Sequence, residues 1–471
     1  MRGPMHRRDP ISPDWPFRPA RVPVFYGWVV VAIGTVGFLM SIPGQTAGVS
    51  VFTDHLMEAT GMSRLGLSNA YLVGTIGGGL LLPSAGTFID RFGVRVAGML
   101  ASIVLAGTLC LLTIGDRISA AVASTLGTPA IMTAIAIFAV GFFFLRFSGQ
   151  GCLTLVSRTM IGKWFNRKRG LASAVSGLFS SFAFAAAPRI LSEGVSWWGW
   201  RGTWLVLAAL IGLGMTTLAL LFYRDNPEEC GLEMDGGPPT RKVDTADKHG
   251  RPAIDHDRTP AADADHAQEP TEYDFTRSEA LRTLAFWATT LALSLHSLIY
   301  TALAFHIVDL GTWAGIEEKE IVSLFIPIAV LSTVGGYVFG VLADRIDPKF
   351  LVMVMMFGLT LGTASAAFLS PDWTIRTTMV IGLGLSSGCF VPVSTVLLPK
   401  YFGRVHLGSI SGAQMMGLVV ASALGPSILA VSRQFAGGYR PGFLAFVALP
   451  AATLVLAFWI RNPQPAQAEL M

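Results

Sequence analysis

Charged side chains are scarce in this sequence. Asp, Glu, Lys and Arg make up 14% of its 471 residues, whereas hydrophobic residues make up 52%. With a mean hydropathy of +0.56, the chain is too apolar for an ordinary soluble enzyme, and we interpret it as a membrane protein. The net charge of +4 is too small to favour a nucleic-acid partner.

Motifs for disulfides, metals and nucleotides are also missing. The four cysteines form no Cys-x-x-Cys pair, and three of them lie inside apolar runs, so neither a disulfide framework nor a zinc site is indicated. No Gly-x-x-x-x-Gly-Lys-Ser/Thr sequence is present, which argues against ATP-driven pumping by this chain alone. His296 and His306 lack a plausible third metal ligand, so we expect no metal and no cofactor.

Long apolar runs recur along the chain. A transmembrane helix needs roughly 20 mainly apolar residues, and twelve such runs are separated by charged or turn-rich breaks. The sequence therefore predicts an all-α integral membrane protein with twelve transmembrane helices. Their predicted limits are 25–52, 67–89, 94–114, 131–161, 170–191, 202–223, 283–309, 321–342, 350–370, 377–399, 408–431 and 441–460.

The distribution of basic residues indicates the orientation. Connections on one side carry pairs or clusters, such as Arg91 with Arg95 and the run 167–169, whereas those on the other side carry mostly one Arg each. An excess of Lys and Arg favours the cytoplasmic side. We therefore expect a multi-pass protein of the cytoplasmic (inner) membrane with both termini in the cytoplasm. The first apolar run is about twice the length of a signal-peptide core, so we interpret it as a retained span.

The hydrophobic pattern stops between spans six and seven. Residues 224–282 are rich in Asp, Pro, Gly and Ala and poor in large apolar residues, which is typical of a solvated, largely disordered linker. The predicted organisation is a cytoplasmic tail (1–24), a six-helix bundle (25–223), the cytoplasmic linker (224–282), a second six-helix bundle (283–460) and a cytoplasmic tail (461–471).

Segments of the first bundle recur in the second. "GTFIDRFGVR" (86–95) matches "GVLADRIDPK" (340–349), and "KWFNRKRGLASAVSG" (163–177) matches "KYFGRVHLGSISG" (400–412). Two pairs in the same order at equivalent positions indicate a duplicated unit, hence two pseudo-symmetric bundles. Such a duplication favours a transporter with its site between the halves. Because two fused halves complete one translocation unit, we expect a functional monomer.

These segments resemble the major facilitator superfamily, and the likeness covers the whole chain. The family hallmark after span two, Gly-x-x-x-Asp-Arg-x-Gly-x-Arg/Lys, is met by Gly86, Asp90, Arg91, Gly93 and Arg95. Within the superfamily, the sequences "FYGWVVVA" and "WFNRKRGLASAVSG" resemble the monocarboxylate and oxalate/formate antiporter branch. The acidic residue of that branch in span one and its basic residue in span eight are absent here.

The resemblance implies that the hallmark residues form a conformational gate. A carboxylate at a cytoplasmic helix end can accept hydrogen bonds from the free N–H groups of another helix's first turn, or pair with a nearby Arg. By resemblance, Asp90 makes this contact in the outward-open state and breaks it during the cycle. The second copy keeps Asp344 and Arg345 but has Asp347 in place of the second glycine. The sequence therefore does not decide whether a tight turn forms there. Alternatively, the basic residues only fix the topology.

One cation stands deep in an apolar span. Arg146 lies near the middle of span four, in "FFFLRFSGQG", where a charge costs about 3 kcal/mol or more. Since no other span has a carboxylate at similar depth, we expect a visiting anion to neutralise Arg146, with Gln150 one helical turn away on the same face. The alternatives are that Arg146 reaches Asp54 or Asp309 near the outer helix ends, or is satisfied by carbonyls and water.

Other polar residues are predicted to face the same cavity. Gln45 follows the Pro-Gly pair at 43–44, where a kink is expected. His296 and Tyr300 lie one turn apart in span seven and are candidate ligands. His296 and, nearer the outside, His306 are candidates for proton coupling, because histidine changes its charge near neutral pH. A neutral histidine bonded to a neighbouring helix is an equal alternative.

These features together predict a secondary active transporter and not an enzyme. The expected substrate is a small organic anion of monocarboxylate type, moved by alternating access with proton coupling or anion exchange. The alternatives are an exporter of neutral or cationic drugs or metabolites, a membrane-embedded enzyme and a transporter-like sensor. The expected partners are the anion, the lipid bilayer and protons.

Overall fold

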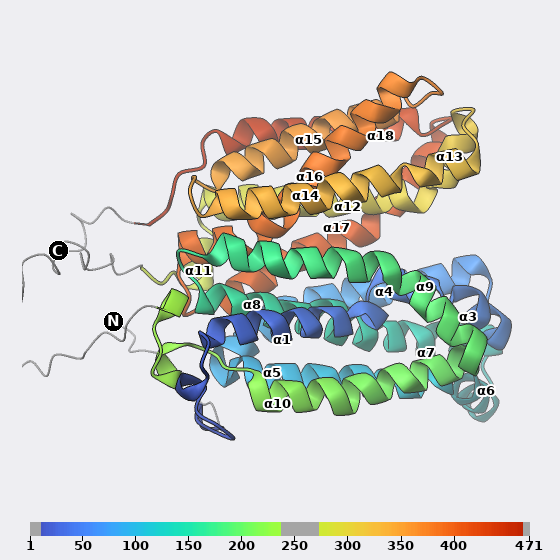
Figure 1. Cartoon of the computed structure of the whole chain (residues 1–471). Helices are drawn as coiled ribbons and strands as arrows, with labels where there is room; N and C mark the ends of the chain where they lie inside the picture. Colours follow the sequence, from blue (N-terminus) through green and yellow to red (C-terminus); the bar gives the residue numbers. More distant parts are fainter. Residues whose placement is uncertain (1–10, 237–272, 465–471) are drawn as a thin grey trace, which may run out of the picture.

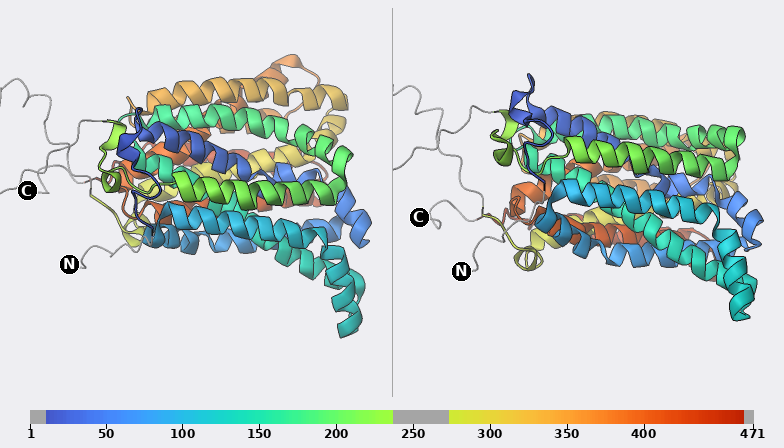
Figure 2. Two further views of the ribbon diagram at one scale, coloured as in Figure 1. Left: turned by 60° about the horizontal axis from the view of Figure 1, so that its bottom comes forward. Right: turned by 90° about the horizontal axis from the view of Figure 1, so that it is seen from below.

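The computed structural model of the chain describes residues 11–236 and 273–464. In these residues it forms helices and no strand, and the helices make two bundles lying side by side (Figure 1). Both described chain ends and both ends of the linker lie at one end of the bundles, which we call the linker face. The other end is the opposite face, near which helix α6 projects sideways from the first bundle (Figure 2).

The first bundle contains the chain from span one to span six. Its elements are α1 (Tyr26–Met40), η2 (Ile42–Gly44), α2 (Thr46–Ser50), α3 (Thr53–Thr60), α4 (Arg64–Leu80), α5 (Leu82–Thr113), α6 (Gly115–Leu126), α7 (Ala130–Leu145), η3 (Arg146–Leu153), α8 (Thr154–Trp164), α9 (Arg169–Ala209), η4 (Leu210–Met215) and α10 (Thr216–Phe222). A short helix, η1 (Pro19–Arg21), precedes them.

The second bundle repeats this arrangement with fewer breaks in its helices. Its elements are α12 (Leu284–Trp313), α13 (Glu318–Ser323), α14 (Phe325–Ala343), α15 (Lys349–Ala367), α16 (Trp373–Phe402), α17 (Leu407–Phe435) and α18 (Arg440–Ala457). Nine helical stretches in the described residues are long and apolar enough to cross a membrane. Two more spans are broken into shorter helices, and one stretch, 169–222, contains two spans, so the predicted twelve-helix fold is confirmed.

Two glycines form the sharp turns at which one span ends and the next begins, within the stretches labelled α5 and α9. In α5 the backbone of Gly93 has φ 84°, and in α9 that of Gly199 has φ 68°. This left-handed region is open to glycine at no steric cost. At the equivalent place in the second bundle Asp347 does not adopt positive φ. Its carboxylate instead accepts hydrogen bonds from the Lys349 N–H and the Tyr401 hydroxyl, so a capped break replaces the glycine turn.

Span one is interrupted where a kink was predicted. Helix α1 ends at Met40, the short helix η2 covers Pro43 and Gly44, and α2 begins at Thr46. Proline cannot donate a helical hydrogen bond, and the break leaves backbone carbonyls of this region without helical partners. A Cβ atom on Gly44 would lie 2.6 Å from the carbonyl oxygen of Leu145, so span one packs closely against span four here.

The two bundles meet most closely near the linker face. A Cβ atom on Gly86 in α5 would lie 2.0 Å from the carbonyl oxygen of Gly408 in α17, and one on Gly170 in α9 would lie 1.9 Å from that of Gly340 in α14. Small residues allow such backbone approach between membrane helices. Every hydrogen bond found between the bundles in residues 11–236 and 273–464 lies in the half of the molecule next to this face.

The two ends of the linker are folded onto the linker face. After span six come η5 (Glu228–Cys230) and η6 (Met234–Gly236), and before span seven lies α11 (Arg277–Ala280). Asp235 accepts hydrogen bonds from the N–H groups of residues 166–168, and Asp274 accepts them from Arg404 and Val405. The composition of 224–282 did not indicate these contacts. Residues 237–272 of the predicted disordered linker lie outside the described residues, as do parts of both predicted tails.

We expect the substitution Gly86→Ala to open the linker face. Its added methyl group cannot fit 2.0 Å from the Gly408 oxygen, so the bundles must separate there. The measurement is the rate of thiol labelling at Ser411→Cys, a position between the bundles, in a background without the four native cysteines. Gly107→Ala in the same helix is the control, because nothing lies within 4 Å of its Cβ. Equal labelling rates in the two variants would contradict the expectation.

Candidate functional site

Asp90 connects the first bundle to the second. Its carboxylate oxygens accept hydrogen bonds from the backbone N–H groups of Gly408 at 2.8 Å and Ser409 at 2.7 Å. Both donors belong to the first turn of α17, where N–H groups have no partner within the helix and the helix dipole favours negative charge. The contact predicted for the hallmark carboxylate is present in this state of the protein.

Asp344 makes the symmetric contact from the second bundle. Its carboxylate accepts from the N–H groups of Gly170 at 2.6 Å and Leu171 at 3.1 Å, in the first turn of α9. Burial raises the pKa of this carboxyl, and the two amide donors together with Arg169 oppose that shift. Each bundle therefore has one carboxylate that binds the N-terminus of a helix in the other bundle.

The other hallmark residues do not cross between the bundles. Gly93 provides the positive-φ turn. Arg95 is buried and donates to the carbonyl oxygens of Tyr223, Ser12 and Trp15, so it holds the N-terminal segment against the first bundle. Arg91 and Arg345 are exposed at the linker face. The predicted gate residues seen to contact the other half are Asp90 and Asp344, through hydrogen bonds, and Gly86, which lies against Gly408.

Arg146 is buried within the first bundle. Its guanidinium donates to the carbonyl oxygen of Gly44 at 3.0 Å and to Thr46 Oγ1 at 3.5 Å, and it lies over the ring of Tyr71 at 5.1 Å. The kink in span one exposes the carbonyl that Arg146 uses. The two acidic residues considered as partners are engaged elsewhere, with Asp54 bound to Arg64 and Asp309 to Arg433.

The predicted glutamine ligands lie near Arg146. Gln45 donates to Ser41 Oγ at 3.1 Å and to Thr154 Oγ1 at 3.4 Å, which ties span one to span four. The Oε1 atom of Gln150 is buried and has no hydrogen-bond partner in the described residues. The structure thus brings Arg146, Gln45 and Gln150 together inside the first bundle. Their role as substrate ligands stays a prediction.

The predicted residues of span seven belong to a different environment. His296 Nδ1 lies 2.9 Å from Ser386 Oγ, and its ring stacks on Tyr300 with centroids 5.6 Å apart. His306 lies nearer the opposite face, where it contacts the carbonyl of Pro426 and the hydroxyl of Tyr439. All these contacts are within the second bundle, so the structure does not join the histidines to Arg146.

Arg158 is the cation that the sequence did not single out. It lies on α8 and forms no hydrogen bond or ion pair with any residue in the described ranges, while its guanidinium lies over Phe38 at 5.6 Å and over Phe390 at 5.8 Å. Phe38 belongs to α1 and Phe390 to α16, so Arg158 contacts both bundles. A half-buried cation without a protein counter-charge at the interface of the halves is a candidate anion site.

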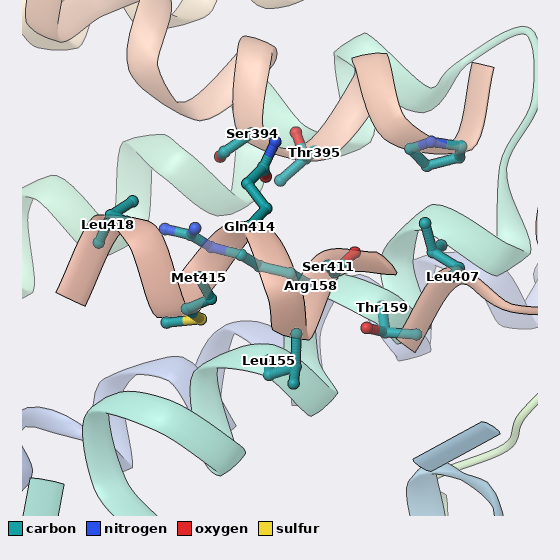
Figure 3. Close-up of a pocket in the computed structure, with 11 residues that line it drawn as sticks. Leu155, Arg158, Thr159, Ser394, Thr395, Leu407, Ser411, Gln414, Met415 and Leu418 are labelled. Carbon is teal, nitrogen blue, oxygen red and sulfur yellow. The ribbon is translucent and has the colours of Figure 1, made fainter. Parts of the chain in front are cut away.

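Arg158 points along a narrow cavity between the bundles. Figure 3 shows its side chain extending beside Gln414 toward Leu418 and away from Leu407. The cavity has a volume of about 20 Å³, which is the room of about one water molecule. Gln414 of α17 lines it, and its buried Nε2 atom has no partner in the described part of the chain. Donors from the two bundles, Arg158 and Gln414, therefore line one narrow cavity.

The position of Arg158 in the sequence explains why it was missed. It stands six residues before the end of α8, at Trp164, where a long side chain would ordinarily reach the membrane surface. In a helix, however, side chains lean toward the N-terminus, which for span four means away from the linker face. This direction places the guanidinium deeper in the membrane. The lean of the side chain was the only signal in the sequence that could have indicated this position.

Ser386 is the residue that most favours the alternative of a membrane-embedded enzyme. It lies in "GLSSG" (384–388), the Gly-x-Ser-x-Gly spacing of hydrolase nucleophiles, and it is hydrogen-bonded to His296. Hydrolases place this serine on a sharp strand-to-helix turn, whereas Ser386 is inside α16. No carboxylate of the described residues hydrogen-bonds to His296, so the third group that orients a catalytic histidine is missing.

The duplicated bundles, the carboxylate contacts between them and the enclosed central cavity define a transporter-like membrane protein. The family model of the Major Facilitator Superfamily matches residues 33–426. The chain belongs to this superfamily of membrane transporters. No curated protein matches it significantly in sequence.

Two solved structures share the fold. The human organic anion transporter MFSD10 (TETRAN) has a TM-score of 0.57 and 14% identity, covering 91% of this chain and 98% of that one. The E. coli fucose:proton symporter FucP has a TM-score of 0.58 and 13% identity, covering 92% of this chain and 98% of that one. At these identities the likeness shows the fold alone.

We expect Arg146→Gln to lower thermal stability. The substitution removes the cation that satisfies the Gly44 carbonyl and lies over Tyr71, and a buried hydrogen bond to a charged group contributes roughly 1.5–3 kcal/mol. The measurement is the unfolding midpoint of the purified protein in detergent. Arg189→Gln, which removes an exposed pair with Glu193, is the control and should unfold like wild type. An unchanged midpoint for Arg146→Gln would contradict this account of Arg146.

Proposed function

We propose that the protein is a secondary active transporter of organic anions and that Arg158 binds the anion. The observation that carries this proposal is the environment of Arg158, a cation at the interface of the bundles with no ion pair in residues 11–236 and 273–464. Guanidinium groups bind carboxylates through two parallel hydrogen bonds. Gln414 from the other bundle supplies a second free donor to the same cavity.

The distribution of charge disfavours the exporter of cations. A cavity that binds cationic drugs needs an acidic group at depth, whereas the polar groups found beside Arg158 are amide and hydroxyl groups of Gln414, Ser394, Thr395 and Ser411. The similar fold of an organic anion transporter is compatible with the proposal but does not carry it. Monocarboxylates are the simplest anions that fit one guanidinium.

In this proposal the aspartate contacts form the gate. Asp90 and Asp344 hold the linker face shut, and the anion enters from the opposite face. Rocking of one bundle against the other breaks both contacts and opens the linker face. We propose that the linker face is cytoplasmic, that the membrane is the inner membrane and that one chain suffices for transport.

Replacement of Arg158 tests the proposal. We expect Arg158→Gln to abolish the thermal stabilisation that small carboxylates give to the purified protein, because binding to the folded state alone raises its stability. Uptake of the same carboxylates into proteoliposomes should also be lost, while Arg158→Lys keeps the charge and retains part of the binding. Arg189→Gln serves as the matched control, since Arg189 is exposed and away from the cavity.

Two outcomes would contradict the proposal. One is carboxylate-dependent stabilisation of equal size in wild type and Arg158→Gln. The other is stabilisation by organic cations alone, which would favour the exporter. If binding is instead lost in Arg146→Gln at full thermal stability, the anion site belongs in the first bundle, as the sequence predicted.

Proton coupling is tested at His296. We propose that this histidine carries the coupled proton, because it lies beside Phe390, which contacts Arg158. His296→Asn keeps a hydrogen-bonding side chain toward Ser386 but cannot titrate near neutral pH. We expect uptake driven by an inward proton gradient to fall to the rate without a gradient, while exchange of anion for anion continues. A gradient response equal to wild type would exclude His296 and favour anion exchange or another proton carrier.

A further inference from the structure

We infer that the transported anion is an aromatic carboxylate, whose carboxylate binds Arg158 while its ring enters between Phe38 and Phe390. This inference rests on the proposed function and adds the chemistry of the substrate's uncharged part. It comes from the aromatic side chains that surround the guanidinium and from the bundle to which each belongs.

Aromatic rings continue outward from both sides of Arg158. In the first bundle, Phe38 packs on Phe184 of α9 with ring centroids 5.2 Å apart. In the second, Phe390 packs on His296 at 5.0 Å. His296 stacks on Tyr300, which meets Phe325 of α14 at 6.2 Å. The guanidinium therefore occupies the gap between two aromatic walls, one from each bundle.

These rings lie at the edge of the packing core and not inside it. Phe38, Phe184, Phe390, Tyr300 and Phe325 are all half-buried, whereas the packing core of each bundle is fully buried. Rings that keep an exposed part next to a cation between two moving bundles provide an apolar, flat surface. A hydrophilic anion such as phosphate or sulfate gains nothing from such walls, whereas an aromatic ring gains stacking with both.

The charge of Arg158 affects how its neighbouring aromatic rings can bind a substrate. In the structure, Arg158 of the first bundle is attracted to the face of Phe390 of the second, a cation–π contact that joins the halves. A bound carboxylate neutralises the guanidinium and weakens this attraction. The faces of Phe38 and Phe390 then become available to the substrate ring. The direct contact between Arg158 and Phe390 is thus replaced by an indirect one, in which the substrate binds to residues of both bundles.

The experiment compares four probe molecules on the purified full-length protein. Benzoate has the carboxylate and the aromatic ring, cyclohexanecarboxylate has a ring without π faces, acetate has the carboxylate alone, and benzamide has the ring without the charge. Dissociation constants are obtained from thermal stabilisation titrations. We expect benzoate to bind roughly tenfold more tightly than cyclohexanecarboxylate and acetate, and benzamide to show no saturable binding.

Variants of the aromatic walls locate the effect. Phe390→Leu should remove most of the preference for benzoate over acetate, while Phe390→Tyr keeps the ring and the preference. Phe357→Leu is the matched control, because Phe357 is 54% exposed on α15 and away from these rings. A cooperative thermal unfolding transition without ligand shows that Phe390→Leu is folded, and if that variant does not fold, Phe38→Leu tests the wall of the first bundle.

The outcomes separate the inference from the proposed function. Equal affinity for benzoate, cyclohexanecarboxylate and acetate, with binding lost in Arg158→Gln, would overturn the aromatic substrate and leave the anion transporter standing. A benzoate preference that survives both leucine variants would also overturn it. If no carboxylate binds in a manner that depends on Arg158, both the inference and the proposed function fail.

Discussion

The structure depends on one kind of interaction, a carboxylate bound to the free N–H groups at the start of a helix. Asp90 binds the first turn of α17, Asp344 binds that of α9, and the backbones around them are in contact through glycine. Because the donors are backbone groups, their geometry is fixed by the helix itself. Asp235 and Asp274 at the linker ends hold the loops that lead into these same two helices.

The two arginines of span four, Arg146 and Arg158, have different environments. Arg146 contacts the carbonyl of Gly44, the oxygen of Thr46 and the ring of Tyr71, all within one bundle, although its buried Nε atom has no partner in the described residues. Arg158 has only the faces of two phenylalanine rings, one from each bundle. Burying a cation is unfavourable unless its hydrogen bonds are made. This difference is the reason for proposing Arg158, and not Arg146, as the group that binds the anion.

Much of the fold was predictable from sequence, because span length, the kink at 43–44 and the duplicated hallmark are each local signals. The turn at Asp347 was not, since it depends on Tyr401, which is distant in sequence and completes the cap. The sequence predicted a site around Arg146 in span four, and that prediction stays untested, whereas Arg158 in the same span was not singled out. The position of a residue along a helix does not show in which direction its long side chain points. Only the packing of α8 against α1 and α16 shows which arginine reaches the interface.

The bond between Arg146 and the Gly44 carbonyl has a consequence for how the protein is made. Synthesis and membrane insertion proceed from the N-terminus, so span one is in place before span four leaves the ribosome. The oxygen that receives the arginine therefore already lies in the membrane when the charge arrives. A circularly permuted chain that presented span four first would have to insert a bare guanidinium, at a cost of about 3 kcal/mol or more. The order of the helices in the gene is thus part of what makes this buried charge tolerable.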